Sequence, residues 1–384
     1  MSRLFFRQFM RKLEEFTTLL ASAVVNNLIF SRKILIKEHI SKIAVIKLDH
    51  MGDVILSIPA LACLRESFPE AHITMVVSPS TKQIAEYIPY IDEVICYNAR
   101  FFNRSGNTKR FGLSKAIDFI FDMKEKDFDL LIDLRGSFAS IGLALASASC
   151  YRLDRAEYII NRKLSKNKLW PEHEAEVNLD LLAGKGLNVN HREIYLDIPE
   201  KDIKSTDKIL GLNEDTYKTI ITIHPGSPII FKRWSIDNYI KLSHRLYEKY
   251  RSRLVFIGVK EEEKIVEGIV SHLERCDTIN LCGKTSLSQL IAVLSKSDIF
   301  IGNDSGPMHL ASACGTKTIG LFGPSSPKRF GPYGDNSYSL RMEKKCPPCM
   351  GVKCKYPGYR CIDNISVEDV MRKIDDIIPD KNRN

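Results

Sequence analysis

Short apolar runs alternate with longer amphipathic stretches along most of the chain. The runs that have the length and β-branched content of strands are 42–48, 72–77, 93–97, 129–134, 219–223, 254–258, 279–282, 299–301 and 318–322. The stretches between them that predict helices are 54–68, 80–88, 113–126, 138–148, 236–250, 261–273, 287–294 and 308–314. Strands and helices that alternate in this way predict parallel sheets covered on both faces.

The alternation falls into two series, separated by the polar residues 198–216, which carry no long apolar run and are predicted to be the domain linker. A length of 384 residues also fits two domains. We therefore expect an α/β protein with two doubly wound, Rossmann-like domains and a catalytic cleft between them. The predicted divisions are 1–40, 41–200, 215–345 and 346–384.

One strand–turn–helix unit stands out in the second series. Its strand ends at Ile301, the polar loop 302–306 follows, and Pro307 occupies the first turn of a short helix. Backbone N–H groups at a helix N-terminus attract anions. Asp304 and His309 lie at this end of the helix. The unit predicts a seat for the diphosphate of a nucleotide sugar.

Four polar loops follow predicted strands, at 49–53, 224–234, 258–261 and 302–309. Open α/β sheets place their ligands at this edge, and no glycine fingerprint of a nicotinamide-binding dehydrogenase occurs there. Sugar transfer from a nucleotide diphosphate must stabilise the leaving diphosphate and remove a proton from the attacking hydroxyl. Lys232, with the amides of Ser305 and Gly306, suits the first task, and Asp53 suits the second.

Three stretches resemble family 9 glycosyltransferases, the ADP-heptose:lipopolysaccharide heptosyltransferases of Gram-negative bacteria. They are KLDHMGDVILSIPAL (47–61), IHPGSPIIFKRW (223–234) and NDSGPMHLASACGTKTIGLFGPSSPKRFGPYG (303–334). The resemblance covers roughly residues 41–375. It implies a GT-B fold whose N-terminal domain binds the acceptor and whose C-terminal domain binds the donor. It also implies inverting transfer of a heptose from ADP-heptose to a lipid A–core hydroxyl.

The resemblance assigns roles to individual residues. Asp53 resembles the family's general base, Lys232 the residue on the diphosphate, and Glu261 the acidic donor-binding residue at the ribose. The turn that cradles the donor is Asp304, Ser305, Gly306 and His309. His50 and Arg135 are candidate acceptor-binding residues, and His50 stands where the family commonly has a small polar residue. No metal or other cofactor is required, because Lys232 and helix N-termini take its place.

Simpler structural roles remain open for the same residues. Asp53 could cap the following helix, Glu261 could complement a helix dipole, and His309 could be a core histidine. Lys232 could be a surface lysine. Two other functions also stay open: a GT-B enzyme that uses another nucleotide sugar for a cell-envelope glycan, and a nucleotide-sugar-binding protein without turnover.

The distribution of charge indicates which kinds of binding partner the protein favours. The formal net charge of +9 is mild and diffuse, so it fits an anionic substrate or membrane surface rather than nucleic acid. Residues 1–40 combine apolar positions at helical spacing with several Arg and Lys, while their apolar stretch is too short to span a bilayer. Residues 1–30 are thus predicted to contact the cytoplasmic face of the inner membrane as an interfacial helix. The alternative is a helix that packs on the protein.

Most of the ten cysteines lie in apolar runs, as expected for buried thiols in a reducing compartment. The last four form a C-x2-C-x4-C-x6-C cluster at Cys346, Cys349, Cys354 and Cys361. Because only the first pair is tightly spaced, a structural metal site, disulfides and free thiols all remain open. A final helix at 367–377 has Ser366 and Asp369 as predicted caps, and the GT-B resemblance implies that it packs across the N-terminal domain.

Overall fold

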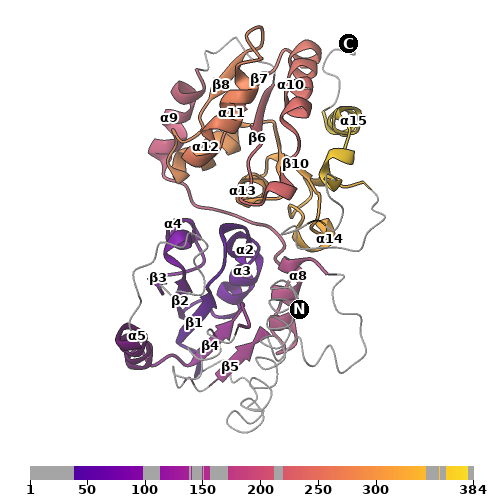
Figure 1. Ribbon diagram of the computed structural model, residues 1–384. Coiled ribbons are helices and arrows are strands. Elements are labelled where there is room, and N and C mark those ends of the chain that lie inside the picture. Colours follow the sequence, from indigo (N-terminus) through magenta and orange to yellow (C-terminus); the bar gives the residue numbers. More distant parts are fainter. Residues whose placement is uncertain are drawn as a thin grey trace. The chain divides into compact units, whose positions relative to one another are not determined.

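The computed structural model describes residues 39–97, 113–137, 140, 149, 151–155, 172–211, 219–342, 354 and 360–378. The chain divides into two compact units, Met1–Glu193 and Ile194–Asn384. Each unit contains one parallel sheet (Figure 1). We describe the two units separately.

The sheet of unit 1 has the strand order β3-β2-β1-β4-β5, and all its described pairings are parallel. The strands are β1 (Lys42–Lys47), β2 (His72–Val77), β3 (Glu93–Cys96), β4 (Leu130–Asp133) and β5 (Tyr151–Asp154). The helices are α2 (Met51–Ile55), α3 (Ile58–Ser67), η2 (Pro79–Thr81), α4 (Lys82–Ala85), α5 (Leu113–Glu125) and α8 (Glu174–Ala183). The order reverses between β1 and β4, so this is the switch point at which such sheets bind ligands.

The single helix predicted at 54–68 is instead two helices, α2 and α3. The Ser57 hydroxyl, between them, donates a hydrogen bond to the Val54 carbonyl at 2.7 Å. Pro59 cannot donate a backbone hydrogen bond. The local break turns the chain between α2 and α3, so that α2 is a separate short helix directly after β1.

The sheet of unit 2 has the order β11-β10-β9-β6-β7-β8, again parallel throughout its described pairings. Its strands are β6 (Ile220–His224), β7 (Arg253–Phe256), β8 (Thr278–Asn280), β9 (Ile299–Asn303), β10 (Lys317–Leu321) and β11 (Ser337–Leu340). Counted from β6, this is the 3-2-1-4-5-6 order of the Rossmann fold, with its switch point between β6 and β9.

The helices of unit 2 cover this sheet (Figure 1). They are α9 (Glu200–Leu210), η4 (Ile230–Lys232), α10 (Ile236–Tyr250), η5 (Lys260–Glu262), α11 (Glu263–Val270), α12 (Leu287–Lys296), α13 (Gly306–Ala313), α14 (Pro327–Phe330), η6 (Cys361–Asn364) and α15 (Val367–Ile377). The capping box predicted at Ser366 and Asp369 of α15 is confirmed. A second box, at Ser286 and Gln289, begins α12.

The final helix packs within unit 2, which differs from the expected packing across the N-terminal domain. Its apolar stripe, including Val370 and Ile374, belongs to the same buried cluster as Ile221 of β6 and Leu242 of α10. Figure 1 shows α10 and α15 side by side. The stripe buries its apolar side chains against a helix of its own unit, which gives α15 a complete set of core contacts.

The segment expected to be a linker also differs. Residues 200–210 form α9, which packs against α12 in unit 2. Other elements, among them β5, α8, β11 and α14, were not predicted from the sequence. The predicted helix at 138–148 and nearly all of the N-terminal segment 1–40 lie outside the described residues.

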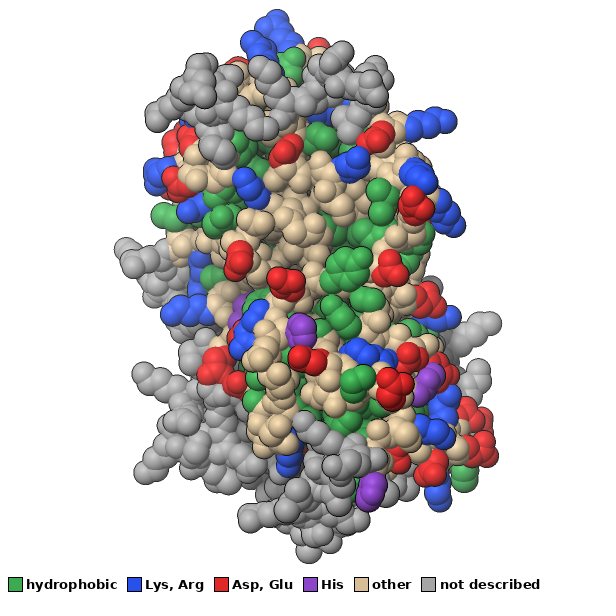
Figure 2. All heavy atoms as spheres, turned by 180° about the vertical axis from the view of Figure 1, so that it is seen from behind, with side chains coloured by type: hydrophobic (Ala, Val, Ile, Leu, Met, Phe, Trp, Pro, Cys, Tyr) green, Lys and Arg blue, Asp and Glu red, His purple; other side chains and the backbone are tan. Residues whose placement is uncertain are grey.

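Charges of both signs are interspersed on the face shown in Figure 2. On the described part of that face, the net positive charge is therefore not gathered into one patch. No helix among the residues that the structure describes is long and apolar enough to cross a bilayer.

Candidate active site

The first turn of α13 is the centre of the candidate site in unit 2. β9 ends at Asn303, and α13 begins at Gly306 with Pro307 in its first turn. The Lys232 ammonium donates to Asp304 Oδ2 at 2.5 Å, and Ser325 Oγ donates to the same oxygen. This ion pair brings η4 to the N-terminus of α13. Two of the predicted donor-binding residues therefore lie together, beside the backbone amides expected to bind a phosphate.

A buried histidine connects the two strands at the switch point of unit 2. His224, the last residue of β6, has Nδ1 3.1 Å from Ser305 Oγ and Nε2 3.0 Å from Glu262 Oε2. Ser305 Oγ also lies 3.0 Å from the Asn303 carbonyl, to which it can donate. His309, one turn into α13, is buried as well. Sequence reasoning named Ser305 and His309 but missed His224.

The two neighbouring acidic residues of η5 have different surroundings. Glu261, the predicted donor-binding carboxylate, is exposed, whereas Glu262 is buried and bonds to His224 and to the Val259 amide. Two glycines make room for Glu262. A Cβ on Gly226 would lie 2.0 Å from Glu262 Oε1, and one on Gly258 would lie 3.0 Å from Oε2. A pattern of three successive Glu residues could not indicate which of them turns inward.

Asn303 fixes the loop after β6 to the end of β9. Its side-chain oxygen accepts from the Trp234 amide at 3.0 Å and from the Tyr239 hydroxyl at 3.1 Å. Its side-chain nitrogen donates to the carbonyls of Pro225 and Gly226 at 2.8 and 3.1 Å. All these bonds are buried, so the loop that leads to Lys232 is held rigidly against the start of α13.

In unit 1, Asp53 lies in the first turn of α2, directly beyond the carboxyl end of β1. Burial raises the pKa of Asp53, and the nearby Asp49 carboxylate raises it further while Lys47 opposes the shift, to give a pKa of about 6. No hydrogen bond to the Asp53 carboxylate forms within the described parts of the chain, and α2 has no side-chain cap. The helix-capping alternative for Asp53 is therefore not supported.

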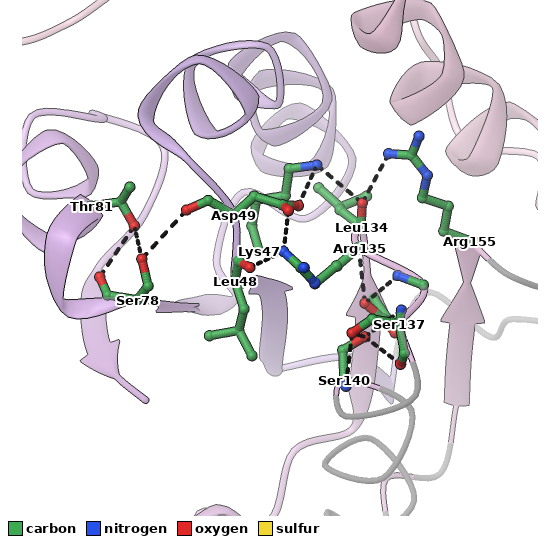
Figure 3. Close-up of polar contacts among 12 residues, drawn as sticks. Lys47, Leu48, Asp49, Ser78, Thr81, Leu134, Arg135, Ser137, Ser140 and Arg155 are labelled. Atoms are coloured by element: carbon green, nitrogen blue, oxygen red, sulfur yellow. Dashed lines mark hydrogen bonds and ion pairs between the residues drawn. The ribbon is translucent and has the colours of Figure 1, made fainter. Parts of the chain in front are cut away.

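A set of charged groups, several of which act on the pKa of Asp53, ties β1 to β4. Figure 3 shows these groups. The Lys47 ammonium, fully buried, lies 3.3 Å from Asp49 Oδ2 and donates to the Leu134 carbonyl at 3.1 Å. Arg135 donates to the other Asp49 oxygen and to the Leu48 carbonyl. Arg155 also donates to the Leu134 carbonyl, at 3.1 Å. Arg135 thus lies at the switch point of unit 1, where its guanidinium is bonded to Asp49.

His50 occupies the N-cap position of α2. It follows Leu48 by two residues, and the Leu48 carbonyl accepts a hydrogen bond from Arg135. The two candidate acceptor-binding residues therefore belong to the loops that end β1 and β4. Sequence analysis did not identify Lys47 as a site residue, because it lies inside a predicted apolar strand. Its ion pair with Asp49 could not be predicted from that pattern.

The cysteine cluster is only partly visible. Cys354 and Cys361 are half-buried, whereas Cys346 and Cys349 lie outside the described residues. In the ranges that the structure describes, no group of three or more His, Cys, Asp or Glu side chains could hold a metal ion. A structural metal site, disulfides and free thiols therefore stay open for the four cysteines.

Comparison with known proteins identifies the family. The sequence profile described as Glycosyltransferase family 9 (heptosyltransferase) matches residues 118–360, more than half of the chain. The chain belongs to glycosyltransferase family 9. This family 9 glycosyltransferase is similar to Lipooligosaccharide heptosyltransferase 2 of Campylobacter jejuni, with 25% identity over 336 residues that cover 85% of this chain and 95% of that relative.

Two solved structures support the fold of the family 9 glycosyltransferase. A family 9 glycosyltransferase from Veillonella parvula has a TM-score of 0.74 at 24% identity, covering 88% of this chain and 97% of that one. The E. coli ADP-heptose LPS heptosyltransferase II has a TM-score of 0.68 at 20% identity, covering 88% and 98%. With the two parallel sheets, these likenesses confirm the expected GT-B fold with two Rossmann-like domains.

Proposed function

We propose that this glycosyltransferase moves a heptose from ADP-heptose to a hydroxyl of the lipopolysaccharide inner core, with inversion at the anomeric carbon. The observation that carries the proposal is the match to the heptosyltransferase family over residues 118–360. The relative in C. jejuni and the E. coli enzyme bear names that specify heptose transfer, and the E. coli name specifies ADP-heptose.

In this proposal the donor binds at the first turn of α13. Lys232 and the amides that follow Asp304 stabilise the negative charge that develops on the leaving diphosphate, so a metal ion is not needed. Ser305, Gly306 and His309 complete the cradle. The exposed Glu261 carboxylate binds the ribose hydroxyls. Support comes from the 2.5 Å contact between Lys232 and Asp304, which holds the lysine at the helix N-terminus.

Asp53 acts as the general base in this proposal. It accepts the proton of the acceptor hydroxyl as that oxygen attacks the anomeric carbon of the heptose and the bond to the diphosphate breaks. A pKa of about 6 makes Asp53 a stronger base than an ordinary aspartate while leaving it mostly ionised at neutral pH. His50 and Arg135 are proposed to contact the lipid A–core acceptor.

The acceptor is a lipid, so we propose that the enzyme works on the cytoplasmic face of the inner membrane. Residues 1–30 would supply a peripheral membrane contact. The proposed domain roles are membrane association for 1–40, acceptor binding for 41–200, donor binding for 215–345, and a Cys-rich segment with the last helix for 346–384.

A panel of nucleotide sugars tests the function. The full-length protein is incubated with ADP-heptose, ADP-mannose, UDP-glucose or GDP-mannose and a lipopolysaccharide acceptor that ends at the inner core. Mass spectrometry then measures whether the acceptor has gained the mass of one sugar. Transfer is expected from ADP-heptose, and Asp53→Ala should abolish it while ADP-sugar affinity stays nearly unchanged. Transfer only from UDP- or GDP-sugars would overturn the proposed donor, and full turnover by Asp53→Ala would remove Asp53 as the base.

A further inference from the structure

Three side chains form a continuous hydrogen-bonded chain from η5 to the first turn of α13. Glu262 Oε2 lies 3.0 Å from His224 Nε2, and His224 Nδ1 lies 3.1 Å from Ser305 Oγ. His224 is only 3% exposed. Ser305 is next to Asp304, whose carboxylate holds Lys232. The hydrogen-bonded series of side chains therefore ends at the turn where the donor diphosphate is proposed to bind.

The hydrogen-bond partners determine where the protons lie at the inner end. Glu262 Oε2 also accepts the Val259 amide at 3.1 Å. Burial alone would raise the pKa of Glu262, but the hydrogen bond and the charge of His224, together with the Val259 amide, leave its pKa below the usual value. Glu262 is thus a carboxylate, which can only accept. His224 must then carry a hydrogen on Nε2.

Two arrangements remain at the outer end. If His224 is neutral, Nδ1 has a lone pair and accepts the hydroxyl hydrogen of Ser305. If His224 is protonated, Nδ1–H donates to Ser305 Oγ, and the hydroxyl hydrogen turns to the Asn303 carbonyl at 3.0 Å. Only in the protonated state can Ser305 keep its bond to His224 and also donate its hydrogen to a phosphate oxygen.

We propose that Glu262 and His224 are positioning residues for the donor diphosphate, and that His224 takes up one proton from solvent when the diphosphate binds. The proton turns the Ser305 hydroxyl into a donor at the cradle and adds a positive charge behind it. This inference rests on the proposed donor site at α13.

The residues around Glu262, His224 and Ser305 keep these three side chains in place. The bare Cα positions of Gly226 and Gly258 leave the space that the Glu262 carboxylate fills. The Tyr239 hydroxyl reaches the His224 carbonyl at 3.4 Å. The described titratable and charged groups around His224 and its two partners are Glu262, Asp304, Lys232, Arg233, Tyr239 and Cys282.

Calorimetry of ADP-heptose binding to the full-length protein tests the inference. Both ends of this diphosphate are esterified, so the ligand itself has no proton that titrates near neutral pH. Titrations in two buffers of different ionisation enthalpy give the number of protons taken up. The wild type is expected to take up protons at pH 7.5, and its affinity should fall by up to about tenfold per pH unit as the pH rises through the range of uptake.

Glu262→Gln is the decisive variant. Its side-chain oxygen takes the place of Glu262 Oε2 and accepts from the Val259 amide and from His224 Nε2, but the negative charge that stabilises a protonated His224 is lost. Proton uptake and the pH dependence of the affinity should therefore disappear, and the affinity at neutral pH should fall. A purely structural role would also lower the affinity but would leave proton uptake unchanged. Ser305→Ala should also abolish uptake, and Ser305→Thr should restore it.

Glu263→Gln removes the same charge one residue further on, without touching His224, and is the matched control that should behave like the wild type. Gly226→Ala, whose Cβ displaces the Glu262 carboxylate, should reduce proton uptake. Binding without proton uptake in the wild type, or equal uptake in Glu262→Gln, would overturn this inference alone. Absence of any ADP-heptose binding by the wild type would overturn the donor assignment, and the inference with it.

Discussion

At the scale of single residues, the environment of Asp53 combines a raised pKa that suits the proposed general base with a cost in stability. Burial and the neighbouring Asp49 disfavour its charged form and bring its pKa to about 6. The same shift that makes the carboxylate a better base also means that ionised Asp53 destabilises the folded protein. Residues of an active site commonly carry such a cost.

Asp53→Asn is therefore expected to lower the rate of transfer by at least about a hundredfold. The same substitution should stabilise the fold. The folded pKa of Asp53 lies above the ordinary aspartate value of 3.8, so the cost of ionised Asp53 is absent below that pH and complete above about 6. The free energy of unfolding of the variant should exceed that of the wild type by about 1–3 kcal/mol at pH 7.5. At the lowest pH the two should be equal. Urea unfolding across pH measures this gain.

The matched control is Asp49→Asn. Its carboxylate pairs with buried Lys47 and with Arg135, so removing its charge should lower stability at neutral pH rather than raise it. Wild-type transfer also has its own signature, because it should rise as the pH passes about 6 and Asp53 ionises. A less stable Asp53→Asn at pH 7.5 would contradict the interpretation of its environment.

The candidate residues differed in how far the sequence could identify them. Asp304 and Lys232 were found because they stand in polar loops directly after apolar runs, and the structure brings them together. Glu262 could not be told from Glu261, since the inward direction depends on how a single turn of η5 is placed over two glycines. Asn303 and Lys47 end buried strands, where their polar bonds are set entirely by tertiary neighbours.

At the scale of secondary structure, strong periodicity predicted most central strands and the longer helices. The predicted capping residues of α15 were also correct, because a cap depends on side chains only three positions apart. The missed strands β5 and β11 are short edge strands, and their charged or hydroxyl side chains break the apolar pattern. The packing partner of α15 was wrong, because a helical stripe shows which face is buried and not what buries it.

Ser366→Ala tests the value of one such cap. Ser366 Oγ accepts the Asp369 amide at 3.1 Å and donates to Asp369 Oδ2 at 2.7 Å. The variant should lose about 1 kcal/mol of unfolding free energy. The bond from Ser366 holds the pKa of Asp369 below its ordinary value, so the stabilisation is present at neutral pH and is lost as the pH falls through the lowered pKa.

Thermal and urea unfolding at neutral and acid pH measure this difference, with Ser366→Thr as the control that keeps the hydroxyl. The loss in Ser366→Ala should shrink in acid. A loss of equal size at both pH values would show that the Asp369 carboxylate does not contribute through the cap.

At the scale of the whole molecule, both units follow one topological rule. Each reverses its strand order next to its first strand, between β1 and β4 in one unit and between β6 and β9 in the other. Each places its candidate residues in the loops at that point: Asp53 and Arg135 in unit 1, Lys232 and Asp304 in unit 2. The alternating sequence pattern was sufficient to predict this plan, since right-handed crossovers leave few other arrangements of parallel strands.

The last prediction concerns the N-terminal segment, whose helical apolar spacing and basic residues suit an anionic lipid surface. The full-length protein should float with phosphatidylglycerol vesicles, and deletion of residues 1–35 should abolish flotation while transfer to a detergent-dispersed acceptor continues. Each Arg or Lys near such a surface contributes about 1 kcal/mol. Replacing Arg3, Arg7, Arg11 and Lys12 by Gln should therefore weaken flotation strongly, whereas replacing Lys381 and Arg383 should not. Unchanged flotation after the deletion would end the membrane proposal.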